Sequence, residues 1–123
     1  MIARTYIMSN SPNDRRIDYI EFPTTDLPAT KKFYNDVFGW DFQDYGPDYS
    51  SFHDGRLAGG FTAEATVQKG GVLVVLYAAD LEAIEAKVKE AGGKITKATF
   101  SFPGGRRFHF GDPSGNELAV WSE

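Results

Sequence analysis

The first half of the chain alternates apolar and polar residues in a way that predicts one strand, one helix and three short strands. Residues 17–22 alternate with the period of a strand, and residues 27–38 carry apolar positions on one side at helical spacing. Thr25 or Asp26 can cap the start of this helix, and Gly39 can end it in a left-handed conformation. Short strands are then predicted over 40–42, 49–53 and 57–62.

The second half repeats the same order of elements. A strand is predicted over 72–77, and Asp80 is placed to cap a helix that Gly92 and Gly93 end. The apolar positions of this helix again fall on one face. Three further strands are predicted over 94–102, 107–110 and 117–121.

Two dipeptides recur in matching places and support an internal repeat. The Asp-Leu pair at 26–27 recurs at 80–81, and the Phe-His pair at 52–53 recurs at 108–109. The repeat predicts an α+β fold of two βαβββ modules, whose curled mixed sheet forms a cup with the helices outside. We expect a single domain over 1–123, with module 1 at about 17–62, a linker at 63–71 and module 2 at about 72–122.

Composition and charge exclude several classes of function. The chain of 123 residues has a formal net charge of −4 and lacks the basic surface that binds the phosphates of nucleic acids. It contains no cysteine, which excludes disulfides, thiolate nucleophiles and cysteine metal sites. The longest apolar run, 72–79, is too short to span a bilayer, and residues 1–16 resemble an irregular lead-in more than a signal peptide. We therefore expect a soluble, cytoplasmic protein that binds neither nucleic acid nor membrane.

Aromatic residues make up 15% of the chain. Such side chains either fill a core or line a small-molecule cavity. The core is favoured for four residues that lie on the first helix stripe or face a helix: Phe22, Phe33, Phe38 and Trp40. The better candidates for a pocket are Tyr19, Phe61, Tyr77 and Trp121.

Motifs in both halves resemble the vicinal oxygen chelate superfamily, which includes glyoxalase I, bleomycin-resistance proteins and extradiol dioxygenases. The resemblance is carried by PTTDL (23–27), KFY (32–34), VFGW (37–40), ADL (79–81), AGG (91–93) and FGDPSGNEL (110–118). It is strongest to the glyoxalase-like branch related to lactoylglutathione lyase. The resemblance implies a two-module cup that takes a small molecule, and a homodimer that shares sites across its interface.

In metal-using members of that superfamily, four ligands from strands of both modules hold a divalent ion that binds neighbouring oxygens of the substrate. Carried onto this sequence, three ligand positions fall at Tyr19, Leu73 and Ala119, and the fourth falls near Gly59 or Gly60. A first-row divalent ion needs three or four nitrogen or oxygen donors. Tyr19 alone does not supply them, so we expect no metal site and no cofactor.

Strand alternation predicts which side chains line the cup. The expected ligand pocket consists of Tyr19, Glu21, Phe61, Leu73, Tyr77, His109, Glu117, Ala119 and Trp121. His53 would join them if its strand turns it inward. One guanidinium of Arg106-Arg107 could hold an anionic substrate at the mouth of the cup, although a solvated strand edge is the favoured role for this pair. No catalytic residue is assigned.

Three functions remain after these exclusions. The favoured one is a glyoxalase/bleomycin-resistance-like protein with a degenerate metal site that binds a small, partly aromatic molecule in the cup. The alternative is a lyase, isomerase or dioxygenase-type enzyme whose relocated metal or acid–base site uses Glu21, Glu117 and a histidine. A third is a domain whose filled cup associates with another protein.

Overall fold

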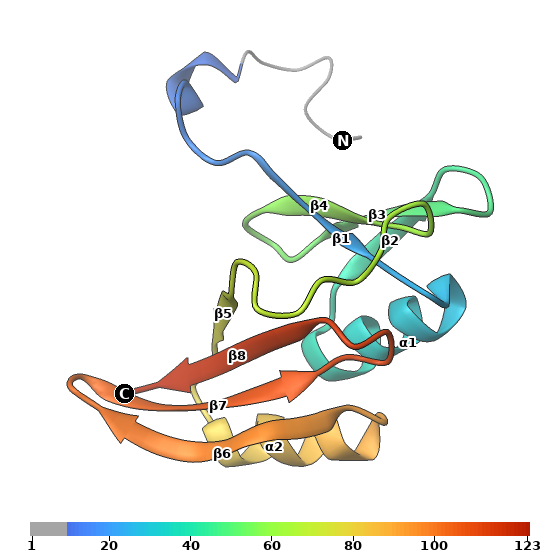
Figure 1. Cartoon of the computed structure of the whole chain (residues 1–123). Helices are drawn as coiled ribbons and strands as arrows, with labels where there is room; N and C mark the ends of the chain where they lie inside the picture. Colours follow the sequence, from blue (N-terminus) through green and yellow to red (C-terminus); the bar gives the residue numbers. More distant parts are fainter. Residues whose placement is uncertain (1–9) are drawn as a thin grey trace.

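The computed structural model describes residues 10–123 and contains two units with the same order of elements (Figure 1). The first unit follows a 3-10 turn, η2 (Ser11–Asn13), and consists of β1 (Tyr19–Pro23), α1 (Leu27–Phe38), β2 (Asp41–Asp44), β3 (Tyr49–His53) and β4 (Ala58–Thr62). The second consists of β5 (Val74–Tyr77), α2 (Leu81–Glu90), β6 (Lys94–Phe102), β7 (Gly105–Gly111) and β8 (Glu117–Ser122). This order confirms the α+β fold with two βαβββ modules. Of the predicted lead-in, residues 1–9 lie outside the described residues.

Two strands begin later than their sequence pattern predicts. β1 starts at Tyr19 and β5 at Val74, in each case where pairing with the neighbouring parallel strand begins. Ile17 and Val72 precede these pairs and are 78% and 93% exposed. The predicted strands start too early because the apolar run begins before the first residue that pairs with a neighbouring strand.

Both helices begin at the acidic residues that the sequence predicts. The carboxylate of Asp26 accepts a hydrogen bond from the backbone N–H of Ala29 at 3.0 Å, and Asp80 accepts one from Ala83 at 3.1 Å. Each cap thereby satisfies an N–H group that has no partner within the helix. Gly39 follows α1 with a φ of +73°, a conformation that glycine adopts without steric cost. No helix among residues 10–123 is long and apolar enough to cross a membrane.

Each module forms its own four-stranded sheet. The strand orders are β1-β4-β3-β2 and β5-β8-β7-β6, and in each sheet the first pair is parallel and the other two are antiparallel. No backbone ladder joins the two sheets within the described part of the chain. The sheets therefore stay unclosed in one copy of the protein.

Helix α1 carries the core that joins the two modules. The ring of Tyr34 lies 4.6 Å from Trp40 and 5.0 Å from Phe61, on the helix-facing side of the first sheet. Phe33 and Phe38 each lie 5.9 Å from Phe110 of β7, in the second sheet. Because both sheets turn their helix-facing sides toward one shared core, their opposite sides form two outer faces that point away from it.

A buried polar network fastens α1 to the turn between β7 and β8. The hydroxyl of Tyr34 donates to Asp112 Oδ2 at 2.9 Å, and Asn116 Nδ2 donates to the same oxygen at 3.0 Å. The other carboxylate oxygen, Oδ1, accepts the backbone N–H groups of Ser114 and Asn116. Burial raises the pKa of Asp112, and these hydrogen bonds oppose the rise because they favour the ionised form.

Removal of the Tyr34 hydroxyl tests how strongly this network joins the modules. We expect Tyr34→Phe to lower the free energy of unfolding by about 1.5–3 kcal/mol at pH 7, because a buried carboxylate loses a hydrogen bond. Urea unfolding followed by circular dichroism measures the change. Tyr45→Phe, which alters an exposed side chain, is the control and should change stability by less than about 0.5 kcal/mol.

The loss of stability caused by Tyr34→Phe should be smaller near pH 4 than at pH 7. Since the pKa of Asp112 is raised, the stability linked to its protonation is fully present below the ordinary aspartate pKa and is lost as the pH rises through the folded-state pKa. The substitution removes a hydrogen bond that favours the ionised form of Asp112, so it raises the folded-state pKa of Asp112 further. The variant therefore loses more stability than the wild type as the pH rises. Equal stability of the variant and the wild type at pH 7 would contradict a joining role for the network.

Candidate functional site

On the outer face of the first sheet, three side chains form a hydrogen-bonded chain. The hydroxyl of Tyr49 donates to Glu21 Oε2 at 2.9 Å, and the hydroxyls of Tyr19 and Tyr49 lie 2.5 Å apart. Because an ionised carboxylate can only accept, Tyr49 gives its proton to Glu21 and Tyr19 donates to Tyr49. The two ends, the phenol of Tyr19 and the carboxylate of Glu21, both come from β1, and β3 supplies Tyr49 between them.

Gly60 of β4 makes room for this chain. It pairs with Glu21 on one side and with Ser51 on the other, and a Cβ atom at this position would overlap the hydroxyl of Tyr49. Partial burial, together with the hydrogen bonds to Tyr19 and Glu21, raises the pKa of Tyr49 far above its ordinary value. Tyr49 is therefore a neutral hydrogen-bond donor at physiological pH.

On the outer face of the second sheet, the strand register aligns an aromatic and cationic row. Tyr77, Trp121, Arg107 and Phe100 are paired in sequence across β5, β8, β7 and β6. The ring of Tyr77 lies 5.2 Å from that of Trp121, and the Tyr77 hydroxyl donates to Glu123 at 2.6 Å. Tyr77 is 53% exposed, so this row forms an accessible aromatic wall.

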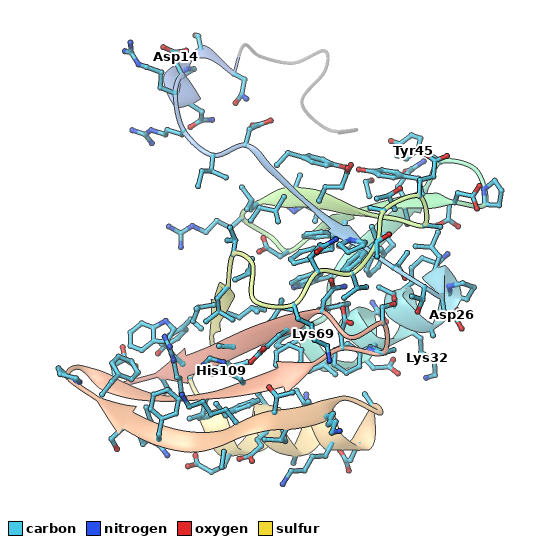
Figure 2. All side chains as sticks on the ribbon, in the orientation of Figure 1. Asp14, Asp26, Lys32, Tyr45, Lys69 and His109 are labelled. Carbon is cyan, nitrogen blue, oxygen red and sulfur yellow. The ribbon has the colours of Figure 1, made fainter. Side chains whose placement is uncertain are left out.

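The next row of the same face holds a histidine fixed by a carboxylate (Figure 2). His109 Nδ1 lies 3.0 Å from Glu117 Oε2, which also accepts the hydroxyl of Thr96 at 3.2 Å. Glu117 can only accept when ionised, so Nδ1 carries the proton and a neutral imidazole keeps its lone pair on Nε2. His109 is 8% exposed, and Nε2 is buried without a hydrogen-bond partner among residues 10–123.

A small hollow opens at this dyad. It has a volume of about 220 Å³ and is lined by His109, Glu117, Leu73 and residues of the linker between the modules. Ala119, the cross-strand partner of His109, is fully buried beneath these side chains. The hollow is large enough for a few non-hydrogen atoms, and His109 is one of the residues that line it.

Arg107 lies one row away and is held between aromatic rings. Its guanidinium carbon is 5.4 Å from the ring centre of Phe100 and 5.9 Å from that of Phe102. Its Nε is buried and has no hydrogen-bond partner in the described part of the chain. The second outer face therefore presents two buried nitrogens, on Arg107 and His109, that nothing within residues 10–123 satisfies.

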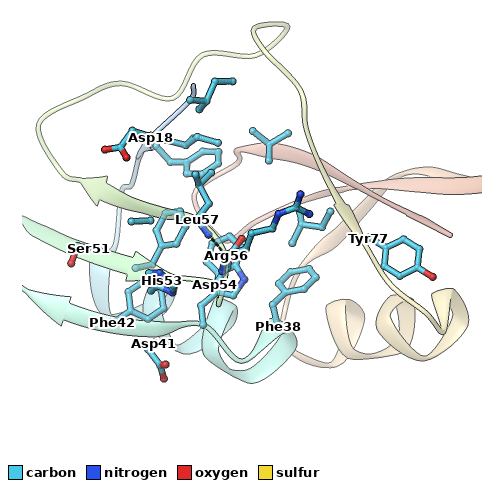
Figure 3. A pocket seen from close by; sticks show the side chains of 18 of the residues that line it. Asp18, Phe38, Asp41, Phe42, Ser51, His53, Asp54, Arg56, Leu57 and Tyr77 are labelled. Carbon is cyan, nitrogen blue, oxygen red and sulfur yellow. Dashed lines mark hydrogen bonds between the residues drawn. The ribbon is translucent and has the colours of Figure 1, made fainter. Parts of the chain in front are cut away.

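A larger open cleft lies between the first sheet and β5 (Figure 3). It has a volume of about 1430 Å³ and is lined by helix-facing aromatic side chains of the first module and by β5. Phe38 and Arg56 project into it, and Tyr77 and Trp121 of the second module also line it. Its wall is part of the core described above, and the outer-face groups Glu21, His109 and Arg107 do not line it.

The structure brings some of the predicted pocket residues together and separates others. Tyr19 and Glu21 share the first outer face. The second outer face unites the predicted residues Leu73, Tyr77, His109, Glu117, Ala119 and Trp121. Within one chain the two groups lie on different outer faces, so Glu21 does not meet the His109–Glu117 dyad.

Two candidates lie elsewhere. The prediction of Phe61 as a pocket residue is wrong: it is 0% exposed and stacks at 5.3 Å on Phe22, its register partner in the core. His53 is exposed, and its Nδ1 accepts the backbone N–H of Gly55 at 3.0 Å, so it belongs to a turn at the rim of the open cleft. Parallel register puts paired residues on the same side of the sheet, which fixes Phe61 on the helix-facing side together with Phe22.

Three contributors were absent from the predicted pocket, and a partial signal existed for two of them. Tyr49 could have been suspected from the glycine pair 59–60 in a neighbouring strand, since glycine inside a strand often admits close approach of another group. For Arg107, the sequence favours a role at a solvated strand edge together with Arg106. In the structure Arg106 pairs with Glu82, whereas Arg107 lies half-buried on the outer face. For Phe100, alternation was ambiguous because β6 carries register irregularities.

The metal positions of the resembled superfamily do not fit a divalent ion here. They fall on Tyr19, Leu73 and Ala119 and near Gly59 or Gly60. Of these side chains only Tyr19 carries a donor atom, and its hydroxyl is engaged with Tyr49. Among residues 10–123, no three His, Cys, Asp or Glu side chains converge as a metal site. The donor set thus lacks the three or four ligands that such an ion requires.

A protein-family comparison matches residues 16–120 to the Glyoxalase/Bleomycin resistance protein/Dioxygenase superfamily. The chain belongs to this superfamily. The match spans both modules and agrees with the motifs that first indicated the resemblance.

Curated relatives cover more than this chain. CFP32 proteins of Mycobacterium bovis and Mycobacterium tuberculosis, provisionally named glyoxylases, are each 26% identical over 140 aligned positions. The alignment covers 98% of this chain and 49% of those relatives, so the chain spans about half of their length.

Solved structures of this superfamily share the fold. A glyoxalase-related enzyme from Fulvimarina pelagi superposes with a TM-score of 0.74 at 18% identity, covering 89% of this chain and 88% of its own. The fosfomycin resistance protein FosX from Mesorhizobium loti superposes with a TM-score of 0.74 at 13% identity, covering 89% and 92%. Lactoylglutathione lyase from Agrobacterium tumefaciens superposes with a TM-score of 0.69 at 20% identity, covering 88% of this chain and 93% of its own. At these identities the likeness shows the fold alone.

The tyrosine chain on the first outer face can be tested through its titration. We expect Glu21→Ala to lower the pKa of Tyr49, because a carboxylate that holds the phenolic proton is removed. NMR of tyrosine labelled at Cζ, with Tyr49→Phe to assign the signal, follows the titration. Tyr45 is exposed and is the internal control. An unchanged Tyr49 pKa in Glu21→Ala would contradict the hydrogen-bonded chain.

Proposed function

We propose that this protein binds a small, partly aromatic molecule on its outer faces, at the place where metal-using relatives hold their ion. The side chains at the superfamily's metal positions offer a single donor atom, so the proposed binding does not depend on a metal ion held there. The observation that carries the proposal is the second outer face, where a half-exposed aromatic row adjoins two buried nitrogens that have no hydrogen-bond partner within residues 10–123. Apolar walls with a few convergent polar groups are typical of small-molecule sites.

We infer that a second copy of the chain completes the site. Each outer face is half of a cup, and within one chain the two halves point away from a shared core. Val75 and Tyr77 of the edge strand β5 remain 41% and 53% exposed, which leaves an edge available to a partner. A dimer that sets the first outer face of one chain against the second of its partner would bring Tyr19, Tyr49 and Glu21 to the dyad.

Ligand binding is tested with three probes of one shape and different charge: 2-naphthoate, 2-naphthamide and 2-naphthylmethylamine. We expect at least one of them to stabilise the protein in a thermal-shift assay, since a ligand at 100 times its Kd adds about 2.7 kcal/mol to the folded state. Trp121→Ala should weaken this binding at least about tenfold, because it removes the centre of the aromatic row.

Tyr45→Ala is the matched control, since Tyr45 is an exposed aromatic residue outside this face, and it should bind like the wild type. Sedimentation equilibrium of the same samples should give a dimer. Failure of all three probes to stabilise the wild type, or a monomer at every concentration tested, would overturn the proposal for binding or for the shared cup, respectively.

A second candidate function is metal-independent acid–base chemistry, as in a lyase or isomerase. The observation that favours it is the His109–Glu117 pair, which orients the imidazole and leaves its buried Nε2 without a hydrogen-bond partner among residues 10–123. Nε2 could take a proton from a carbon next to a carbonyl group and leave an enolate. Return of the proton to another atom or face of the enolate completes an isomerisation, whereas loss of a group from the neighbouring carbon, with the proton passed to that group, completes an elimination.

Proton abstraction is tested with phenylpyruvate in heavy water. If the candidate holds, the protein accelerates deuterium exchange at the benzylic carbon at least about tenfold over buffer, and His109→Gln abolishes the acceleration. Loss of the benzylic proton signal in NMR measures the rate. His53→Gln, at the other histidine, should leave it unchanged. Exchange at the buffer rate in the wild type would remove this candidate and leave the binding function in place.

A further inference from the structure

Arg107 is a cation for which the described part of the chain supplies no anion. Arg106, its neighbour, is paired with Glu82, whereas no acidic side chain among residues 10–123 lies within ion-pair distance of Arg107. Its Nε is buried and unsatisfied. A buried N–H group without a hydrogen bond costs free energy, and an anion bound at this guanidinium would supply an acceptor.

The surroundings of Arg107 fix the guanidinium in place. The ring centres of Phe100 and Phe102 lie 5.4 Å and 5.9 Å from its guanidinium carbon, and Lys97 Nζ lies 4.6 Å from the ring centre of Phe100. Rings packed on a guanidinium leave its edge, where the N–H groups point, available to an acceptor. Arg107 and Lys97 together make this part of the face cationic in a chain whose net charge is −4.

The other charged groups of the face do not neutralise Arg107. Glu117 pairs with Gly111, two rows from the Arg107–Trp121 pair, and is engaged by His109 and Thr96. Glu123 accepts the hydroxyl of Tyr77. His109, one row from Arg107, adds a second unsatisfied nitrogen on the same side of β7.

We propose that Arg107 is the anion-binding group of this site and that the ligand is an organic acid with a planar, aromatic or conjugated body. The carboxylate accepts hydrogen bonds from the guanidinium in the bidentate geometry that matches its two oxygens. Its flat body lies on Trp121, the cross-strand partner of Arg107, with Tyr77 beside it. The inference rests on the proposed binding function and names the class of molecule that is bound.

The wild-type protein tests this with the three naphthyl probes, because they differ only in the group attached to the ring. We expect 2-naphthoate to bind at least tenfold more tightly than 2-naphthamide, and 2-naphthylmethylamine to bind more weakly than either. NMR titration of the 15N-labelled protein gives each Kd and also follows the Nε–H signal of Arg107. That signal should move with the acid and stay still with the amide.

Two variants assign the effect to one arginine. Arg107→Gln should abolish the preference for the acid, so that the acid and the amide bind alike, while Arg106→Gln is the matched control and should keep the preference. Arg107→Lys keeps the charge without the planar fork and should retain only part of the preference. If Arg107→Gln does not fold, the comparison of acid and amide on the wild type still decides.

The outcomes separate this inference from the proposed function. If all probes bind with equal affinity and Trp121→Ala weakens them equally, the protein binds aromatic molecules and the assignment of an acid is overturned. If the acid is preferred but Arg106→Gln removes the preference, the anion site lies elsewhere. If no probe binds, the proposed function itself fails.

Discussion

The burial of Tyr34 between the two modules is the constraint on which the rest of the structure depends. Its ring packs on Trp40 and Phe61 of the first module, and its hydroxyl reaches Asp112 in the last turn of the second. A buried phenol must find a hydrogen-bond partner, and here the partner is itself a buried carboxylate that needs donors. Since α1 is held from both sides, the helix-facing sides of both sheets meet in one core, and the outer faces have to point away from it.

This arrangement keeps the polar groups of the two outer faces apart within one chain. Each outer face carries its own polar group: a phenol–phenol–carboxylate chain on the first sheet, and a histidine–glutamate pair with an arginine on the second. The superfamily positions for metal ligands hold glycine, leucine and alanine in three of four cases. Around two of these positions, small residues accommodate larger neighbours: the Tyr49 hydroxyl lies over Gly60, and Ala119 lies beneath the side chains around the dyad. The polar groups of the two outer faces therefore lie on residues around the ligand positions and not at them.

The fold could be predicted closely because its signals are local. Asp26, Asp80 and Gly39 mark helix ends through hydrogen bonds and backbone angles that involve only nearby residues. Strand ends were less well predicted, since pairing with a distant strand and not the apolar run decides where β1 and β5 begin. For the candidate site, alternation along β8 placed Glu117, Ala119 and Trp121 on one side. It missed Tyr49 and misplaced Phe61, because both depend on which residues of other strands lie opposite them.

The sequence by itself determined the two βαβββ modules, the superfamily, and the loss of donor atoms at the metal positions, because periodicity, caps and residue identity are properties of the chain alone. Only the tertiary structure decided that His109 meets Glu117 and not Glu21, that Arg106 and not Arg107 finds an acidic partner within residues 10–123, and that the outer faces of the two sheets point apart. These facts depend on strand register and on the packing of α1 against both sheets, which bring together residues far apart in the sequence. No local sequence pattern indicates which distant side chain will form a hydrogen bond with a buried polar group.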